Sequence, residues 1–435
     1  MAKITSYPFC SHAPHPAVVG GAFAAADEVL GSHPSTPNSN QRSPYLERLS
    51  VKVKILSMNP VYFKRSYRLH RDDFMDLLSK IRPRVEYSNP FGTHHCDDDC
   101  GHIDPLIQLA ATLRLLAGGS YLDICFGYHI STGTIYKVFW RVLKAIDAVV
   151  DNINFDYDSE EAMEELEATF AKISKGAFRG TVAAGDGIIF RRTKPAAADV
   201  DGNVRSFFTR KGFWGHAVQA FCDGNCKFVH VSQRVCASTH DGTAYVMTGI
   251  AQKIKEGKLS KKWHVVLDEA YKCTDQELSP WKGRQLPSDK DVFNHYLSLH
   301  RQVIERAFGI LVSRWGIFWR LLRFSQAQVE LIVQVCMKLH NMYICISRFG
   351  SGSQAVDVSI YDKQWVRGHD EGADSTVLYT DGTGSRQGER SDLLTTRQAI
   401  TQHLQNMSLS RPQHSKTKQM LQRIKDVTPS GIIML

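Results

Sequence analysis

Long hydrophobic runs are missing from this sequence of 435 residues. No apolar stretch reaches the roughly 20 residues that a membrane-spanning helix needs, which argues against a membrane protein. The N-terminus also lacks a charged start followed by a short apolar segment, so we expect no secretory signal. The ten cysteines are scattered rather than grouped as a disulfide framework, which favours a reducing, intracellular compartment.

Acidic residues are the minority among the charged side chains. The chain has 53 lysines and arginines against 44 aspartates and glutamates, a net charge of +9. A basic protein favours a polyanionic partner, with nucleic acid as the first candidate, although a merely soluble basic protein is the alternative. The length and a hydrophobic fraction of 43% predict a globular chain of two or three domains.

Changes in composition divide the chain into five segments. Residues 1–45 are rich in Pro, Ser, Ala, Gly and His and are expected to be disordered. Apolar periodicity predicts a helical domain over 46–150, and an acidic run predicts a solvated helical connector over 151–174. Strand-like runs followed by helices mark 175–346. The remainder, 347–435, is expected to be a flexible tail with one short helix.

The end of the helical segment is predicted to form a helix-turn-helix-like arrangement. One helix begins at Pro105, a short helix follows a Gly-Gly pair, and Ser131 begins the next helix. On that last helix, Lys137 and Arg141 are placed to meet phosphates or base edges. The alternative is a helical subdomain that only packs.

A cluster of cysteine and histidine between the helices permits a zinc site. Cys96, Cys100 and His102 have metal-ligand spacing. The standard second pair of ligands does not follow at the usual distance, so a polar loop is the default interpretation.

Three acidic residues come from different predicted elements of the 175–346 segment. Asp186 follows an apolar strand-like run, and Asp268 ends the strand Val265–Leu267. Glu305 lies on a predicted helix, Phe293–Arg320, whose apolar residues recur every three or four positions. A lone helical Glu is usually solvated, but three carboxylates brought together repel one another unless a cation joins them. Oxygen ligands favour Mg²⁺ or Mn²⁺, and a two-metal site can cleave a phosphodiester.

Basic residues accompany these acids and are candidates for holding a DNA backbone. Besides Lys137 and Arg141, the set comprises Arg191, Arg192, Lys194, Arg210, Lys211 and Arg301. The order of predicted elements around them is three strands, a helix, a strand and then helices.

Seven motifs in this order resemble the transposases of the PIF/Harbinger group and the nucleases derived from them, within the DDE superfamily. They are LAATLRLLAGGSYLDICFGYHISTGTIYKV, GDGIIF, RKGFWGHAVQAFCD, STHD, LDEAY, FNHYLSLHRQVIERAFGILVSRW and CMKLHNM. The resemblance implies a mixed α/β (α+β) fold, with an RNase H-like catalytic domain after the helical domain. It also implies that Asp186, Asp268 and Glu305 are the DDE acids.

Two motifs depart from the family pattern. D-G-T-H is usual at the first acid, and this chain has D-G-I-I at 186–189. D-S-G-Y or D-A-G-Y is usual at the second, and this chain has D-E-A-Y at 268–271. Glu269 is therefore an alternative ligand. Asp241, in STHD, either caps a helix or lies near the metals.

These observations lead to a metal-dependent DNA endonuclease or transposase that uses water and then a freed 3′-hydroxyl. The alternative is a domesticated, catalytically inactive DNA-binding or complex-forming protein, and an RNA-directed nuclease is a weaker third interpretation. The resemblance further implies a separate Myb-like protein for DNA recognition and nuclear entry. It leaves homo-oligomerisation open.

Overall fold

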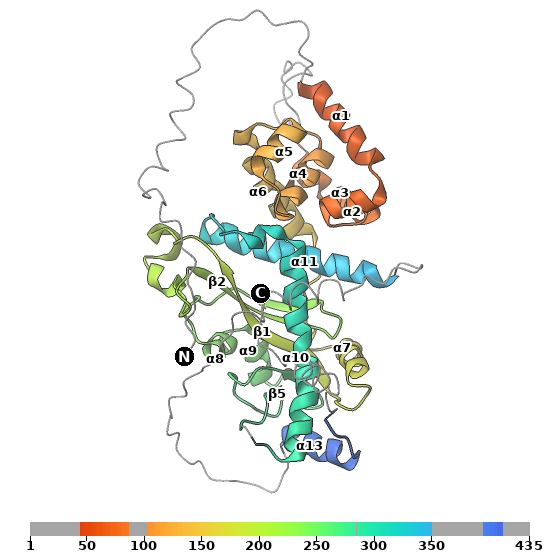
Figure 1. Cartoon of the computed structure of the whole chain (residues 1–435), viewed down its shortest axis with the longest axis vertical. Coiled ribbons are helices and arrows are strands. Elements are labelled where there is room, and N and C mark those ends of the chain that lie inside the picture. Colours follow the sequence, from red (N-terminus) through yellow and green to blue (C-terminus); the bar gives the residue numbers. More distant parts are fainter. Residues whose placement is uncertain (1–43, 87–102, 284, 350–394, 412–435) are drawn as a thin grey trace, which may run out of the picture.

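The structure is a computed structural model that describes residues 44–86, 103–283, 285–349 and 395–411 (Figure 1). The candidate zinc residues Cys96, Cys100 and His102 lie outside these ranges, as do residues 1–43 and most of the expected C-terminal tail. Among the helices that are described, none has the length and apolar character needed to cross a membrane.

The predicted helical segment is confirmed as helical where it is described, and its helices gather at one end of the molecule (Figure 1). Asp104 starts the fourth helix as predicted, because its Oδ1 accepts the backbone N–H of Leu106 at 2.8 Å. The helices are α1 (Pro44–Ser57), α2 (Pro60–Tyr67), α3 (Arg71–Val85), α4 (Pro105–Leu116), α5 (Tyr121–Tyr128) and α6 (Thr132–Val149).

A five-stranded mixed sheet forms the other part of the molecule, in the order β3-β2-β1-β4-β5. Strand β1 is antiparallel to β2 and parallel to β4, while β2 and β3 are antiparallel and β4 and β5 parallel. The sequence predicted four strands, and β5 was not among them. The strands are β1 (Thr181–Arg191), β2 (Gly215–Cys222), β3 (Phe228–Ser232), β4 (His264–Val266) and β5 (Glu277–Leu278).

Each face of the sheet packs into its own hydrophobic cluster. Ala184 and Val266 belong to the cluster that contains α10 (Ser288–Arg314) and α11 (Gln326–Phe349). Ala183 and Val265, which alternate with them along the strands, belong to the cluster on the other face, with α8 (Asp241–Val246) and α9 (Gly249–Lys255). The α10 face is therefore distinct from the α8 face.

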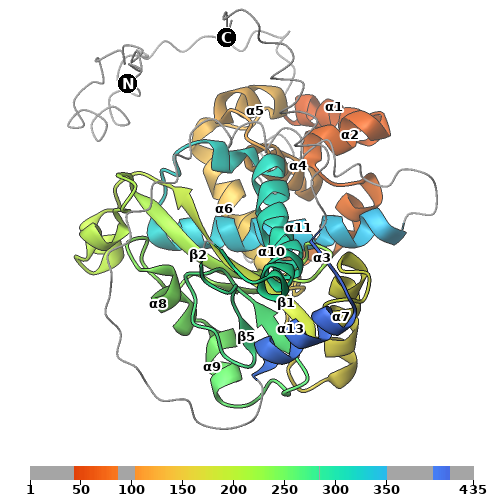
Figure 2. The ribbon, with the colours of Figure 1, turned by 60° about the horizontal axis from the view of Figure 1, so that its bottom comes forward.

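The long helix α10 crosses the sheet, as Figure 2 shows. Its predicted range, Phe293–Arg320, was wrong at both ends. The helix ends at Arg314, and Gly316–Trp319 form the 3₁₀ helix η3. A Cβ atom on Gly316 would lie 2.6 Å from the carbonyl oxygen of Ala117. The close approach of α4 therefore requires glycine at the point where the chain turns.

The acidic segment 151–174 is more than a solvated connector. Its helix α7 (Glu160–Ile173) is capped by Ser159 and packs against β1 and α10. Phe170 is fully buried, and only the opposite face is exposed. The acidic composition of the exposed face concealed this buried stripe.

A C-terminal helix was expected within a flexible tail, but α13 (Thr396–Asn406) packs along α10 (Figure 2). Leu404 is fully buried, and the guanidinium of Arg397 lies 3.6 Å from the ring centroid of Trp281. Arg411 adds an ion pair of 2.9 Å to Asp291, near the start of α10.

Candidate active site

The parallel pairing of β1 and β4 brings the first two acids to the same level of the sheet. Ala184 pairs with Val266 in this register, and Asp186 and Asp268 each lie two residues further on. Because side chains alternate between the faces of a strand, both acids share the face of Ala184 and Val266, which α10 covers. Strand β4 ends at Val266, so Asp268 lies just beyond the strand.

The third acid is held close to the second by an arginine. Arg301 and Glu305 are one turn apart on α10, and Nη2 of Arg301 lies 3.0 Å from Oδ1 of Asp268 and 3.8 Å from Oε1 of Glu305. The carboxylates are 43% and 48% exposed, whereas the arginine is 16% exposed. Arg301 was predicted to contact DNA, but here its guanidinium neutralises the acids.

The other charged groups of the site affect the pKa of Asp186. Burial raises its pKa to about 6, and the negative charges of Asp268 and Glu305 add to the rise. The backbone N–H of Gly187, which donates to Oδ1 of Asp186 at 2.7 Å, and the guanidinium of Arg301 act against it. The structure thus brings the three predicted acids into one electrostatic unit.

A buried polar contact lies beneath this unit. The hydroxyl of Thr181, at the start of β1, is 3.0 Å from Nε2 of His264 on β4 and 3.0 Å from Nδ1 of His300 on α10. All three residues are buried. The contact therefore fixes the three elements that carry the acids relative to one another.

The opposite face of β1 brings further polar groups near the site. A Cβ atom on Gly187 would lie 2.7 Å from Nε2 of Gln219 and 3.5 Å from Oδ1 of Asp241. The amide Oε1 of Gln219 accepts the hydroxyl of Tyr271 at 3.3 Å. Burial is the main cause that raises the pKa of Tyr271, and the negative charges of Asp186 and Asp241 raise it further. A side chain at position 187 would therefore require the amide of Gln219 to move.

Asp241 therefore adjoins the site, but from the α8 face of the strand, across the backbone of Gly187. The helix cap that was considered for it belongs to His240, whose Nδ1 accepts the N–H of Gly242 at 3.2 Å. The STHD motif was the only signal in the sequence for this fourth carboxylate. Gln219 lies in the quoted RKGFWGHAVQAFCD motif, but it was not predicted as a site residue.

The donor set of Asp186, Asp268 and Glu305 consists of carboxylate oxygens, which fit Mg²⁺ or Mn²⁺ rather than zinc. Across the described ranges, no three His, Cys, Asp or Glu side chains are already arranged to hold a metal ion. Arg301 stands between Asp268 and Glu305, so a cation there requires the guanidinium to withdraw.

Most of the predicted DNA-contacting residues are exposed. Arg191, Lys194, Arg210 and Lys211 lie on the surface around the end of β1 and the loop before β2. The guanidinium of Arg191 stacks 4.6 Å from the ring centroid of Phe213. On α6, Lys137 and Arg141 are also exposed.

Arg192 was wrongly grouped with these residues. It is only 2% exposed, and its guanidinium donates to the side chain of Gln326 and, at 3.1 Å, to the carbonyl oxygen of Phe324. Its position at the end of β1 turns it inward, toward the start of α11, so it is a structural residue.

Residues 185–341 match the family described as DDE superfamily endonuclease. The matched segment runs from within β1 to within α11 and contains Asp186, Asp268 and Glu305. This part of the chain thus has the features of a transposase-like nuclease domain. The comparisons with curated proteins and with solved structures gave no match.

Proposed function

We propose that this chain is a divalent-metal-dependent DNA endonuclease or transposase of the PIF/Harbinger type, with Asp186, Asp268 and Glu305 as its catalytic carboxylates. The observation that carries the proposal is the β1–β4 register, which sets Asp186 level with Asp268 on the face that α10 covers. The strand order β3-β2-β1-β4-β5, with three antiparallel strands followed by two parallel ones, supports an RNase H-like domain.

When bound, Mg²⁺ or Mn²⁺ would activate the attacking water or 3′-hydroxyl and neutralise negative charge on the phosphodiester. The protein's own residues prepare the site. The N–H of Gly187 fixes the Asp186 carboxylate, which is mostly ionised at neutral pH because its pKa is about 6. Arg301 keeps Asp268 and Glu305 together against their repulsion.

The basic surface residues give this site a path for a DNA backbone. Arg191 and Lys194 lie at the far end of the strand that carries Asp186. Lys137 and Arg141 line the exposed side of α6, in the helices that we interpret as helix-turn-helix-like. Phosphate contacts of this kind position DNA without reading its sequence.

The proposal is tested by cleavage of supercoiled plasmid with Mg²⁺ or Mn²⁺. Wild type is compared with Asp186→Asn, Asp268→Asn and Glu305→Gln, which retain shape and remove metal-binding charge. Glu269→Gln is the matched control, because Glu269 adjoins Asp268 and was the alternative ligand. We expect the three variants to lose cleavage and the control to retain it.

Equal cleavage by wild type and all variants would show that the activity is a contaminant or that the three acids are wrong. Loss with Glu269→Gln alone would reassign the second acid. If nothing is cut even with a Myb-like partner present, the inactive DNA-binding protein becomes the better interpretation.

We also propose a separate Myb-like partner and nuclear localisation, on the strength of the PIF/Harbinger resemblance. Expressing the protein alone in cells tests both. Exclusion from nuclei, relieved by the partner, supports dependence on it, whereas strong unaided entry contradicts that dependence.

A further inference from the structure

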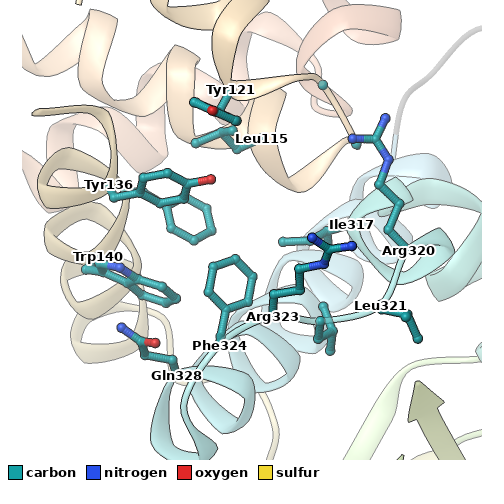
Figure 3. A pocket seen from close by; sticks show the side chains of 14 residues that line it. Leu115, Tyr121, Tyr136, Trp140, Ile317, Arg320, Leu321, Arg323, Phe324 and Gln328 are labelled. Carbon is teal, nitrogen blue, oxygen red and sulfur yellow. The ribbon is translucent and has the colours of Figure 1, made fainter. Parts of the chain in front are cut away.

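An aromatic cleft opens between the helical part and the segment that follows η3 (Figure 3). Its volume is about 720 Å³, within the roughly 300–1,000 Å³ range of pockets that take small ligands. Tyr121, Tyr136 and Trp140 line it from α5 and α6, and Phe324 lines it from the other side. It is separate from the carboxylates of the candidate active site.

The rings of this aromatic cleft have faces and edges available to a planar ligand. Trp140 and Phe324 meet edge to face with centroids 5.2 Å apart, and Tyr121 and Tyr136 are tilted with centroids 5.8 Å apart. Tyr121 remains 37% exposed. Aromatic side chains in this setting stack on bases whatever their identity, because every base has a π-face.

Positive charge accompanies the rings. The side chains of Arg320 and Arg323 line the same cleft (Figure 3). Both residues are exposed. In the portion of the chain that is described, neither arginine forms an ion pair, although other exposed cations such as Lys80 do. Two uncompensated guanidinium groups beside aromatic rings suit a ligand that joins a planar ring to an anion.

Backbone hydrogen bonds connect the cleft to the end of the strand that carries Asp186. Leu322, between the two arginines, donates its N–H to the carbonyl oxygen of Arg191 at 3.1 Å, and its carbonyl accepts from Thr193 at 3.1 Å. Asp186 and Arg191 are five residues apart on β1 (191 − 186), or about 17 Å at the usual strand rise.

We propose that this aromatic cleft binds an unstacked nucleotide of the DNA substrate, away from the phosphodiester at the carboxylates. Its base lies against Tyr121, Tyr136, Trp140 and Phe324, and its phosphate contacts Arg320 and Arg323. That the bound nucleotide belongs to a DNA substrate rests on the proposed nuclease function. We favour a nucleic-acid strand over an acidic, aromatic peptide because its phosphates repeat at every nucleotide and can also contact the exposed Arg191, which is bonded to Leu322 between the two arginines.

The test is binding of an oligothymidylate of about 12 nucleotides, within the site size of single-strand binders, carrying one central 2-aminopurine. Full-length protein is used with chelator, so that binding is measured without cleavage, and each variant is checked for folding by its thermal midpoint. We expect Tyr121→Ala to weaken binding about 5- to 100-fold and to relieve the quenching of 2-aminopurine. Tyr121→Phe keeps the ring, so it should bind with the affinity of wild type and still quench 2-aminopurine.

The arginines are tested by salt dependence. Arg320→Ala and Arg323→Ala should each lower the slope of log affinity against log salt by about one. Arg84→Ala removes an exposed arginine of α3 that does not line the cleft and is the matched control.

The inference is overturned if Tyr121→Ala binds the oligonucleotide as wild type does, or if Arg320→Ala and Arg323→Ala lose no more than Arg84→Ala. It is also overturned if a Glu- and Phe-containing peptide binds the cleft and the oligonucleotide does not. Failure of the proposed nuclease is distinguishable, because Asp186→Asn should abolish cleavage while leaving this binding unchanged.

Discussion

The hydroxyl of Thr181 lies 3.0 Å from Nδ1 of His300, and Glu305 follows that histidine by five positions (305 − 300). Asp186 follows Thr181 by the same number (186 − 181). The other ring that contacts this hydroxyl, His264, precedes the second acid by four. This buried hydroxyl therefore links the three elements that carry the acids, at a point four or five residues before each acid.

Replacing Thr181 with Val should loosen this arrangement. The substitution keeps the shape and leaves two buried imidazole nitrogens without their partner, which costs about 1–3 kcal/mol of unfolding free energy. Cleavage should fall as well, because β1 and α10 lose their polar link. Thr181→Ser keeps the hydroxyl and serves as the control. Urea unfolding and plasmid nicking measure the two effects, and equal values for Val and Ser would contradict the role of the hydroxyl.

Acid should destabilise the protein through its buried histidines. Burial lowers the pKa of His264 to about 3 and that of His300 to about 4. An unfolded histidine titrates near about 6.5, so below that pH the unfolded state binds more protons and the unfolding free energy falls. The loss should begin below about pH 6.5 and continue to about pH 3. His216, His230 and His340 act in the same direction.

Asp186 acts in the opposite direction, because its pKa is raised and its protonation at low pH favours the folded state. The measurement is therefore the slope of unfolding free energy against pH in wild type and in His300→Asn. The variant should have the shallower slope between about pH 6.5 and 4. An unchanged slope would show that His300 has the same pKa in the folded and unfolded states.

Removing Arg301 should make the site depend more on a metal ion. Without the guanidinium, Asp268 and Glu305 repel each other, so Arg301→Gln should lower the thermal midpoint in chelator. Mg²⁺ should then raise that midpoint by about 2–4 °C more than in wild type, since binding to the folded state alone stabilises it. Arg306→Gln, which removes the same charge from α10, is the control. An identical Mg²⁺ response in both variants would contradict competition between Arg301 and the metal.

Arg191 and Arg192 should separate DNA binding from stability. Arg191→Ala removes an exposed cation, so it should weaken DNA binding and leave the unfolding free energy within about 0.5 kcal/mol. Arg192→Ala should cost about 1–3 kcal/mol of unfolding free energy, because Gln326 and the Phe324 carbonyl lose their buried donor. Filter binding and urea unfolding on both variants measure the difference. The reverse pattern would contradict their assignment to surface and interior.

The placement of Asp186, Asp268 and Glu305 on their elements could be predicted because each follows or lies within a strongly periodic element. The order of strands and helices around Asp186, Asp268 and Glu305 also followed from that periodicity. Strand β5 could not be predicted in this way, since two residues are too few to show alternation. It exists because Val265 and Val266 offer a paired edge to Glu277 and Leu278.

The sequence alone could not predict the different roles of Arg191, Arg192 and Arg301. Arg191 and Arg192 have the same chemistry, and only the partner that α11 brings to the end of β1 separates the buried one from the exposed one. Arg301 resembled a DNA contact until the fold placed Asp268 beside it. Long-range contacts of this kind leave no local periodicity to detect.

The docking of α13 has a consequence for how the protein can be divided. Residues 185–341 contain the acids but begin inside β1, after Thr181, and end before α13. A recombinant fragment cut to those limits would split the first strand and uncover Trp281 and Phe293, which α13 and its flanking residues help to enclose. Cutting before α7 would likewise remove α6, which packs against α11. The smallest portion that we expect to be expressed as a stable piece therefore begins within the helical part and extends to Arg411, well beyond residues 185–341.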